Sequence, residues 1–128
     1  MSGASLLLVE DDEGLRAILA RHLRHLGFVV RDVASAEEAT RVLREGFRPA
    51  LVLLDVNLPG DNGWDLLRGP ALAAAGNPPV VVATGTAVSP KRLAEFGVAG
   101  YLPKPFPIET LVDTVERVLN REEPAHKP

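Results

Sequence analysis

Residues 50–56 read ALVLLDV, an apolar run interrupted only by Asp55. A continuous apolar run of this length is typical of a strand that is buried on both faces of a sheet. Shorter apolar runs occur at residues 6–9, 80–83 and 101–102, and residues 28–33, which include Arg31 and Asp32, predict a further strand. Each run is followed by a stretch with apolar residues at helical spacing, which indicates an amphipathic helix. The sequence therefore predicts five strands that alternate with five helices.

Apolar strands that alternate with helices are typical of an α/β fold with a doubly wound parallel sheet and helices on both faces. Two of the predicted helices are unusual. The pair Gly69-Pro70 should break or kink the helix that begins near Trp64, because proline cannot continue a helical hydrogen-bond pattern. The helix that Ser89-Pro90 introduces should be short, since Gly97 ends it.

The composition excludes several classes of protein. With 128 residues, 46% of them hydrophobic, the chain suits one domain with one buried core. It has no cysteine, so we expect neither disulfides nor a zinc–thiolate site, which agrees with a cytoplasmic protein. The net charge is -3 without a basic cluster, which argues against direct nucleic-acid binding. We see no membrane-spanning run and no secretion signal.

Polar residues follow the predicted strands directly. Glu10 and Asp11 come after the first strand, Asp55 lies at the end of the third, Thr84 follows the fourth, and Lys104 comes just after the fifth. In a parallel sheet the carboxyl ends of the strands lie along one edge, where ligands bind. We therefore expect these five residues to lie close together although they are far apart in the sequence.

The residue types predict phosphoryl chemistry at a metal site. Clustered carboxylates need a cation to stay ionised, and oxygen ligands with room for water favour Mg²⁺. A buried aspartate such as Asp55 can act as a nucleophile and form an aspartyl phosphate. Mg²⁺ and Lys104 would neutralise the phosphoryl oxygens, and the Thr84 hydroxyl could donate a hydrogen bond. Taken singly, Glu10 and Asp11 could merely stabilise a helix start, and Lys104 could be a surface lysine.

Four segments in this order resemble the receiver domain of bacterial response regulators, the CheY-like family. They are LLVEDD, LVLLDVNLPGDNGWDLL, VVVATG and GYLPKPF, at residues 7–12, 51–67, 80–85 and 100–106. The resemblance runs from about Leu6 to Leu119 and implies a flavodoxin-like sheet with strand order 2-1-3-4-5. We expect a receiver domain at residues 1–120 and a polar tail at residues 121–128.

The resemblance also implies a role for each acidic residue. Asp55 would accept the phosphoryl group from a histidine kinase or a histidine phosphotransfer protein in a two-component phosphorelay. Asp11 would bind Mg²⁺ directly and Glu10 through water. Asp55 and the backbone carbonyl of Asn57 would complete the metal ligands. Such a domain is a signalling phosphoacceptor rather than an enzyme, because it catalyses only its own phosphorylation and dephosphorylation.

The remaining motif residues would form the switch. Thr84 and Lys104 would contact the phosphoryl group, and the Lys104-Pro105 peptide bond would be cis. Tyr101 falls at the position of the family's switch aromatic, which turns inward when Thr84 moves. The face formed by the last two helices and the fifth strand would then change for a downstream protein partner or effector domain. The same face could form a homodimer.

Three other functions are open at this point. A degenerate receiver that acts as a constitutive docking module would explain the short helix after Ser89. A phosphohydrolase of the haloacid dehalogenase type would also use a strand-end aspartate, but it needs an acid where this chain has Asn57. A flavodoxin needs a phosphate-binding loop after the first strand, and the acids at residues 10–13 would repel a phosphate there.

Overall fold

The structure is a computed structural model that describes residues 3–58, 60 and 62–121. The strands are β1 (Ser5–Val9), β2 (Val29–Val33), β3 (Leu51–Leu54), β4 (Val80–Thr84) and β5 (Gly100–Pro103). The helices are α1 (Glu13–His25), α2 (Ala36–Arg44), α3 (Gly63–Arg68), α4 (Ala71–Ala74), α5 (Pro90–Glu95) and α6 (Ile108–Arg121). The predicted alternation of strands and helices is confirmed, with one extra helix because the third is divided.

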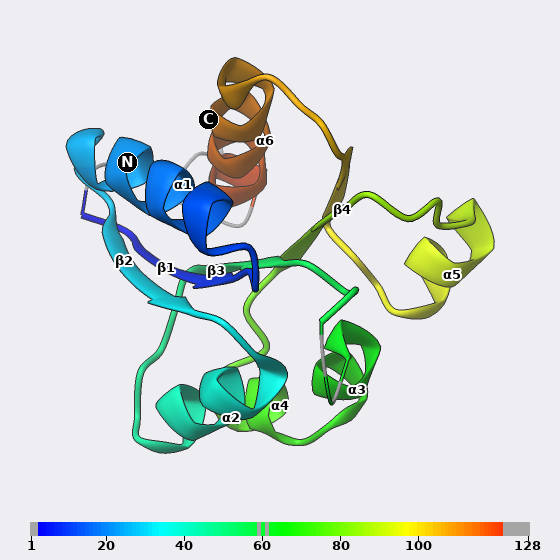
Figure 1. Cartoon of the computed structure of the whole chain (residues 1–128). Helices are drawn as coiled ribbons and strands as arrows, with labels where there is room; N and C mark the ends of the chain where they lie inside the picture. Colours follow the sequence, from blue (N-terminus) through cyan, green and yellow to red (C-terminus); the bar gives the residue numbers. More distant parts are fainter. Residues whose placement is uncertain (1–2, 59, 61, 122–128) are drawn as a thin grey trace.

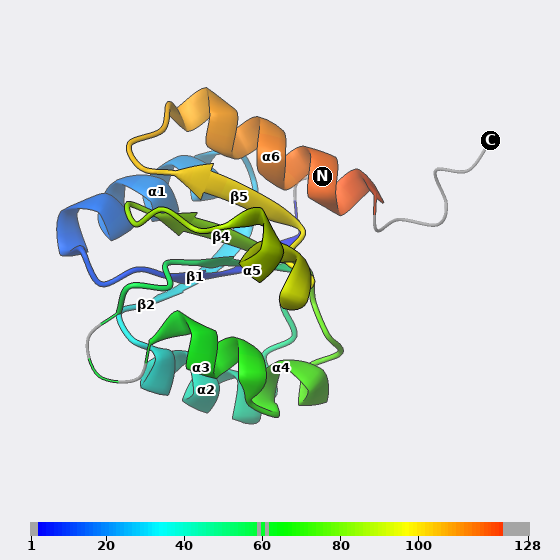
Figure 2. The same ribbon diagram turned by 90° about the vertical axis from the view of Figure 1, so that its right-hand side faces the viewer.

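The five strands form one parallel sheet in the order β2-β1-β3-β4-β5. Helices α1 and α6 cover one face of the sheet, and α2, α3 and α4 cover the other (Figures 1 and 2). This is the doubly wound arrangement that the sequence predicted, and the strand order is the one that the resemblance implied.

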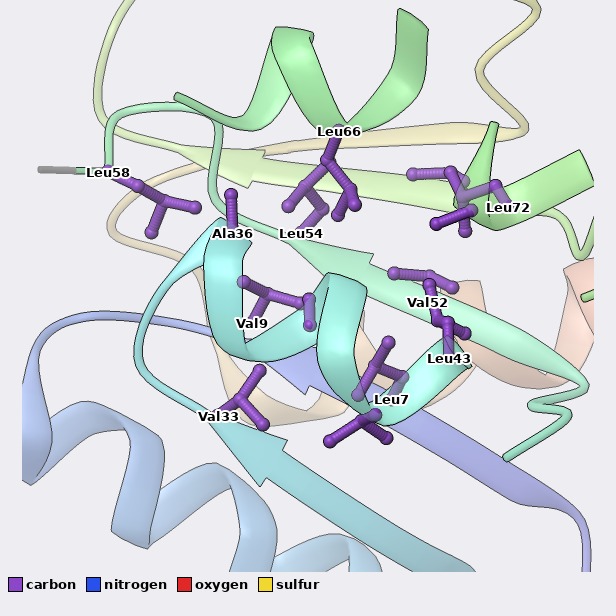
Figure 3. Packing of buried hydrophobic residues seen from close by; sticks show 14 of the residues in the cluster. Leu7, Val9, Val33, Ala36, Leu43, Val52, Leu54, Leu58, Leu66 and Leu72 are labelled. Carbon is purple, nitrogen blue, oxygen red and sulfur yellow. The ribbon is translucent and has the colours of Figure 1, made fainter. Parts of the chain in front are cut away.

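Alternate residues of each central strand pack into two different cores. Leu7, Val9, Val52 and Leu54 point toward α2, α3 and α4, where they meet Leu66 and Leu72 (Figure 3). Their neighbours in the chain pack against α1 and α6; they include Leu6, Leu8, Leu51 and Leu53. Because both faces are buried, an apolar residue is needed at every strand position. This explains the continuous apolar runs of the sequence.

The Gly69-Pro70 pair separates α3 from α4, as predicted. The Gly69 N–H still donates to the Asp65 carbonyl at 3.0 Å, but proline at the next position has no N–H to continue the pattern. Helix α4 therefore starts afresh at Ala71. The short helix after Ser89 is also confirmed: α5 spans six residues, and the Ser89 hydroxyl caps it by accepting from the Arg92 N–H at 3.1 Å.

Helix α5 has no buried residue of its own and is held by aromatic contacts. The rings of Phe96 and Trp64 lie 4.9 Å apart between centroids, which joins the end of α5 to α3. The Arg92 guanidinium lies 5.2 Å from the Trp64 ring centroid, and Arg68 lies 5.2 Å from that of Phe96. Stacking and cation–π contacts of this kind contribute about 1 kcal/mol each. In Figure 1, α5 stands apart from the helices that cover the sheet.

The carboxyl-terminal helix α6 extends to Arg121, one residue into the segment expected to be a tail. The remainder of that segment, residues 122–128, lies outside the described residues. None of the helices within residues 3–58, 60 and 62–121 has the length and apolar content needed to cross a bilayer.

Candidate functional site

Glu10 and Asp55 leave neighbouring strands side by side. The parallel register pairs Val9 of β1 with Leu54 of β3, and the two acids are the next residues along each strand. Their main chains are held by the sheet, since the Asp55 N–H donates to the Val9 carbonyl and the Glu10 N–H donates to the Val33 carbonyl, both at 3.0 Å. Both residues are buried: the exposed fraction is 6% for Asp55 and 2% for Glu10. The two carboxylates are therefore placed by the strands and not by a loop.

Asp11 completes a cluster of three carboxylates at this edge. Glu10, Asp11 and Asp55 each offer an oxygen within 4.8 Å of the others. Asp11 is exposed, whereas the other two are buried, so the cluster opens to solvent on the Asp11 side. Asp12 lies outside this cluster, because its side chain caps α1 by accepting from the Leu15 N–H at 3.0 Å.

Lys104 directly follows β5, which is separated from β3 by β4, and its side chain extends to this cluster. Its N–H donates to the Thr84 carbonyl at 2.9 Å, which fixes the start of the turn after β5. Its Nζ then lies 2.7 Å from Glu10 Oε1 and 3.0 Å from Asp55 Oδ2. The peptide bond from Lys104 to Pro105 is cis, as the resemblance implied. The lysine thus pairs with two carboxylates that are 94 and 49 residues away in the sequence.

The pKa values reflect this crowding. Burial raises the pKa of the Glu10 carboxyl, and the hydrogen bonds from Lys104 and Asp12 offset the effect only in part. Burial acts to lower the pKa of Lys104, but its hydrogen bonds to Glu10 and Asp55 outweigh burial, so this pKa is raised. The pKa values of both groups can be raised together, because Lys104 has two anionic partners, whereas Glu10 has one cationic partner and is more deeply buried.

The residues that follow β3 and β4 form a second group around Thr86. The Asn57 N–H donates to Asp55 Oδ1 at 2.9 Å, while the Asn57 side-chain amide donates to the Thr86 hydroxyl. The Tyr101 hydroxyl donates to the Thr86 carbonyl at 3.5 Å. Thr84 is fully buried at the end of β4, and its hydroxyl accepts from the Thr86 N–H at 3.4 Å. The loop after β4 therefore links the surroundings of Asp55 to the aromatic ring on β5.

The donor set fits a hard divalent cation. All three side chains offer carboxylate oxygens, which Mg²⁺ and Ca²⁺ prefer over softer ligands. Among the residues that the structure describes, one ammonium group lies close to these three acids, that of Lys104, so the three acids and Lys104 together carry two excess negative charges when all are ionised. A divalent cation would balance that excess. Few protein ligands and an open solvent side favour the smaller, hydrated Mg²⁺.

Two residues at this site were not identified from the sequence. Arg16 on α1 donates from Nη1 to the Glu10 carbonyl at 2.9 Å. Gly63 packs against the peptide that follows Asp55, and a Cβ there would lie 2.6 Å from Val56 Cα. The position of Arg16 one turn into a helix was a usable signal, since helical side chains lean toward the helix start. Gly63 gave none, because a glycine before a helix is ordinarily read as part of a turn.

Known proteins share this fold and sequence pattern. The profile of the response regulator receiver domain matches residues 6–116. The DNA-binding transcriptional regulator NtrC of Azospirillum brasilense is 36% identical over 97% of this chain, which spans only 26% of that protein. A CheY-like receiver domain protein from Methanospirillum hungatei superposes with a TM-score of 0.83 at 25% identity, covering 94% of this chain and 96% of that one. The non-phosphorylated HemR receiver domain of Leptospira biflexa gives 0.79 at 33% identity, covering 94% and 98% respectively. The chain therefore belongs to the family of response regulator receiver domains.

Proposed function

We propose that this receiver domain accepts a phosphoryl group on Asp55 from a phosphohistidine, with Mg²⁺ held by Glu10, Asp11, Asp55 and the Asn57 carbonyl. The donor would be a histidine kinase or a histidine phosphotransfer protein, acting in the cytoplasm. The observation that carries the proposal is the setting of Asp55. It is a buried carboxylate at a strand end, beside two further acids and bonded to Lys104.

The chain's own groups suit an in-line transfer. The Asn57 N–H holds Asp55 Oδ1, which orients the carboxylate and leaves Oδ2 facing Lys104. When a carboxylate oxygen bonds to phosphorus, the bond from phosphorus to the donor imidazole breaks. Lys104 could then transfer its hydrogen bonds from the carboxylates to the phosphoryl oxygens, and Thr84 could donate to them. Mg²⁺ would supply charge neutralisation at those oxygens.

The output would be a protein–protein contact controlled by the phosphoryl group. Thr86 is bonded to both Asn57 and Tyr101, so a shift of the loop after β4 would reach the surface of β5. The same loop leads directly into helix α5, which has no buried residue. We propose that this face, α5–β5–α6, binds a downstream partner or effector domain, or a second copy of the chain. The small contact area of α5 would keep the difference in free energy between two arrangements small.

The test is phosphoryl incorporation by the unaltered chain. The protein is incubated with acetyl phosphate, with Mg²⁺ or with a chelator, and its intact mass is recorded over time. We expect a gain of one phosphoryl group in Mg²⁺ and none with the chelator. No gain in either condition, together with no Mg²⁺ binding by calorimetry, would favour the constitutive docking module. Catalytic release of phosphate from a simple ester would instead support a phosphohydrolase.

The donor protein should contact α1, because this helix starts at the acidic cluster. Ile18 on α1 is 63% exposed, an unusual position for a large aliphatic side chain, and the small residues Gly14 and Ala17 before it on the helix are also exposed. Burial of one such side chain in an interface contributes about 1.5–3 kcal/mol. We therefore expect Ile18→Ser to slow transfer from a phosphorylated histidine kinase by roughly tenfold, because 1.4 kcal/mol corresponds to that factor.

Acetyl phosphate provides the internal control for this prediction. It needs no protein contact, so its rate with Ile18→Ser should equal that of the parent. Val29→Ser is the matched variant, since Val29 is also exposed, at 52%, but lies at the amino end of β2, whereas the acidic cluster lies at the carboxyl ends of the strands. Transfer from a panel of autophosphorylated kinases would be followed by radiolabel. Equal kinase rates for parent and Ile18→Ser would exclude α1 as the docking surface.

A further inference from the structure

The Arg16 side chain links the acidic cluster to β2, the outermost strand of the sheet. It is the fourth residue of α1, so its side chain leans back toward the start of the helix and toward the end of β1. There Nη1 donates to the Glu10 carbonyl at 2.9 Å, and Nε donates to Asp32 Oδ2 on β2 at 3.2 Å. One guanidinium thus joins the main chain of a cluster residue to a carboxylate on the neighbouring strand.

The Glu10 carbonyl needs this partner because Glu10 comes after the last residue of β1. The residue is 2% exposed, and a buried carbonyl without a donor is unfavourable. Glu10 is held at three other points. Its N–H donates to the Val33 carbonyl at 3.0 Å, Oε2 accepts from the Asp12 N–H at 3.1 Å, and Oε1 accepts from Lys104 at 2.7 Å.

These contacts differ in whether a bound cation would disturb them. The contact with Lys104 uses a carboxylate oxygen and an ammonium group, so it competes with any cation at the cluster. The contact with Arg16 uses a main-chain oxygen, which is free to keep its donor when the carboxylate changes partners. Arg16 is therefore suited to hold Glu10 and the adjoining Asp11 in both conditions.

We propose that Arg16 is a positioning residue for the divalent-cation site. It holds the turn after β1 so that the carboxylates of Glu10 and Asp11 converge on Asp55 before the cation arrives. The inference rests on the proposed function, and it adds a residue that does not touch the cation. The physical basis is preorganisation: when ligands are already placed, binding does not have to order them.

The forked guanidinium explains why an arginine is used. Its Nε and Nη1 bond to two acceptors in different directions, the Asp32 carboxylate and the Glu10 carbonyl. A lysine has one ammonium group on a flexible chain and reaches one of these acceptors with good geometry, not both. Arg16→Lys should therefore keep part of the effect, whereas Arg16→Met keeps the aliphatic packing but loses both bonds.

Arg24 is a matched control on the same helix. Its Nη2 pairs with the other oxygen of Asp32 at 2.8 Å and donates to the Val30 carbonyl at 2.8 Å. It thus shares the carboxylate partner of Arg16 and also binds a main-chain oxygen, but that oxygen belongs to Val30, the second residue of β2. Arg24→Met removes a comparable set of bonds without releasing Glu10.

The experiment measures Mg²⁺ affinity of the full chain by calorimetry and by Trp64 fluorescence, with thermal unfolding recorded for every variant. We expect Arg16→Met to raise the dissociation constant about tenfold, Arg16→Lys about threefold, and Arg24→Met less than twofold. Phosphorylation by acetyl phosphate should show the same split. Arg16→Met should be slow at limiting Mg²⁺ and should approach the parent rate at saturating Mg²⁺.

The outcomes separate this inference from the proposed function. If the parent binds Mg²⁺ and Arg16→Met weakens binding no more than Arg24→Met does, Arg16 is a structural residue only and the inference is wrong. If the parent itself binds no Mg²⁺, the proposed metal site fails and the inference fails with it. Should Arg16→Met not fold, Arg16→Lys decides alone, and an affinity equal to that of the parent would overturn the proposal.

Discussion

Replacement of Asp55 by asparagine should abolish phosphoryl incorporation and leave the fold intact. The amide has nearly the shape of the carboxylate, and its oxygen can still accept the Asn57 N–H that now lies 2.9 Å from Asp55 Oδ1. It has no anionic oxygen to attack phosphorus, however. Lys104 keeps its bond to Glu10 at 2.7 Å, so no ammonium group is left unpaired. We expect the free energy of unfolding to change by no more than about 2 kcal/mol.

Asp113→Asn is the control for the same change of charge. Asp113 is exposed on α6, and its loss should not alter incorporation. Both variants are incubated with acetyl phosphate and Mg²⁺, and intact mass and circular dichroism are recorded. A phosphoryl group on Asp55→Asn would mean that another residue is the acceptor, and the assignment of Asp55 would be wrong. Loss of incorporation in both variants would point to net charge instead of a single nucleophile.

Much of the fold was predictable because burial leaves a simple pattern. Strands covered on both faces must be apolar at every position, so β1, β3 and β4 could be read directly from residues 6–9, 50–56 and 80–83. The end of α3 and the start of α5 were predictable for a local reason, since Gly69-Pro70 and Ser89-Pro90 act on the backbone of their own segment. The strand order was different. It depends on which strands pair, and it came only from the resemblance to a family.

Most members of the candidate site were predictable from the sequence, but their contacts were not. Parallel strands end at one edge, so polar residues after each strand had to gather there, and Glu10, Asp55 and Lys104 do so. The sequence could not show that Lys104 bonds to both acids, because that contact depends on how far a side chain reaches across β4. Nor could it show that Asn57 and Tyr101 both bond to Thr86.

Contacts to the main chain were the hardest to foresee. Arg16 binds a carbonyl oxygen, and every residue has one, so no pairing of residue types marks the contact. The stack of Trp64 and Phe96 joins α3 to the end of α5, which has no buried residue of its own, and the sequence pattern of neither helix indicates this partner. Such contacts depend on the tertiary arrangement and become visible only when the elements are placed.

Gly63→Ala should destabilise the protein by about 3 kcal/mol, because the backbone leaves no space for a methyl group. A Cβ at this position would lie 2.6 Å from Val56 Cα and 2.9 Å from the Asp55 carbonyl oxygen. Both are main-chain atoms, which cannot turn away as the end of a side chain can. Overpacking of a tight contact typically costs about 1–3 kcal/mol, and a backbone clash lies at the upper end of that range.

The same change should also slow phosphorylation, since relief of the clash must move either α3 or the peptide that follows Asp55. The Gly63 N–H donates to the Val56 carbonyl at 3.1 Å, so the two segments are bonded as well as packed. Denaturant unfolding and acetyl phosphate kinetics would be measured on the same preparation. We expect a lower midpoint together with a lower rate, because the displaced Val56 Cα also begins the next peptide, which carries the Asn57 N–H that orients Asp55.

Gly14→Ala separates this effect from the general preference of helices for alanine. Gly14 lies in the first turn of α1, and the nearest atom to a Cβ there is Asp12 Oδ1, at an ordinary 3.6 Å. Alanine is favoured over glycine in helices by up to about 1 kcal/mol, so this variant should be as stable as the parent or more so. If Gly63→Ala behaved in the same way, α3 would have to shift at little cost, and its close packing on the Asp55–Val56 peptide would not be what orients the acceptor.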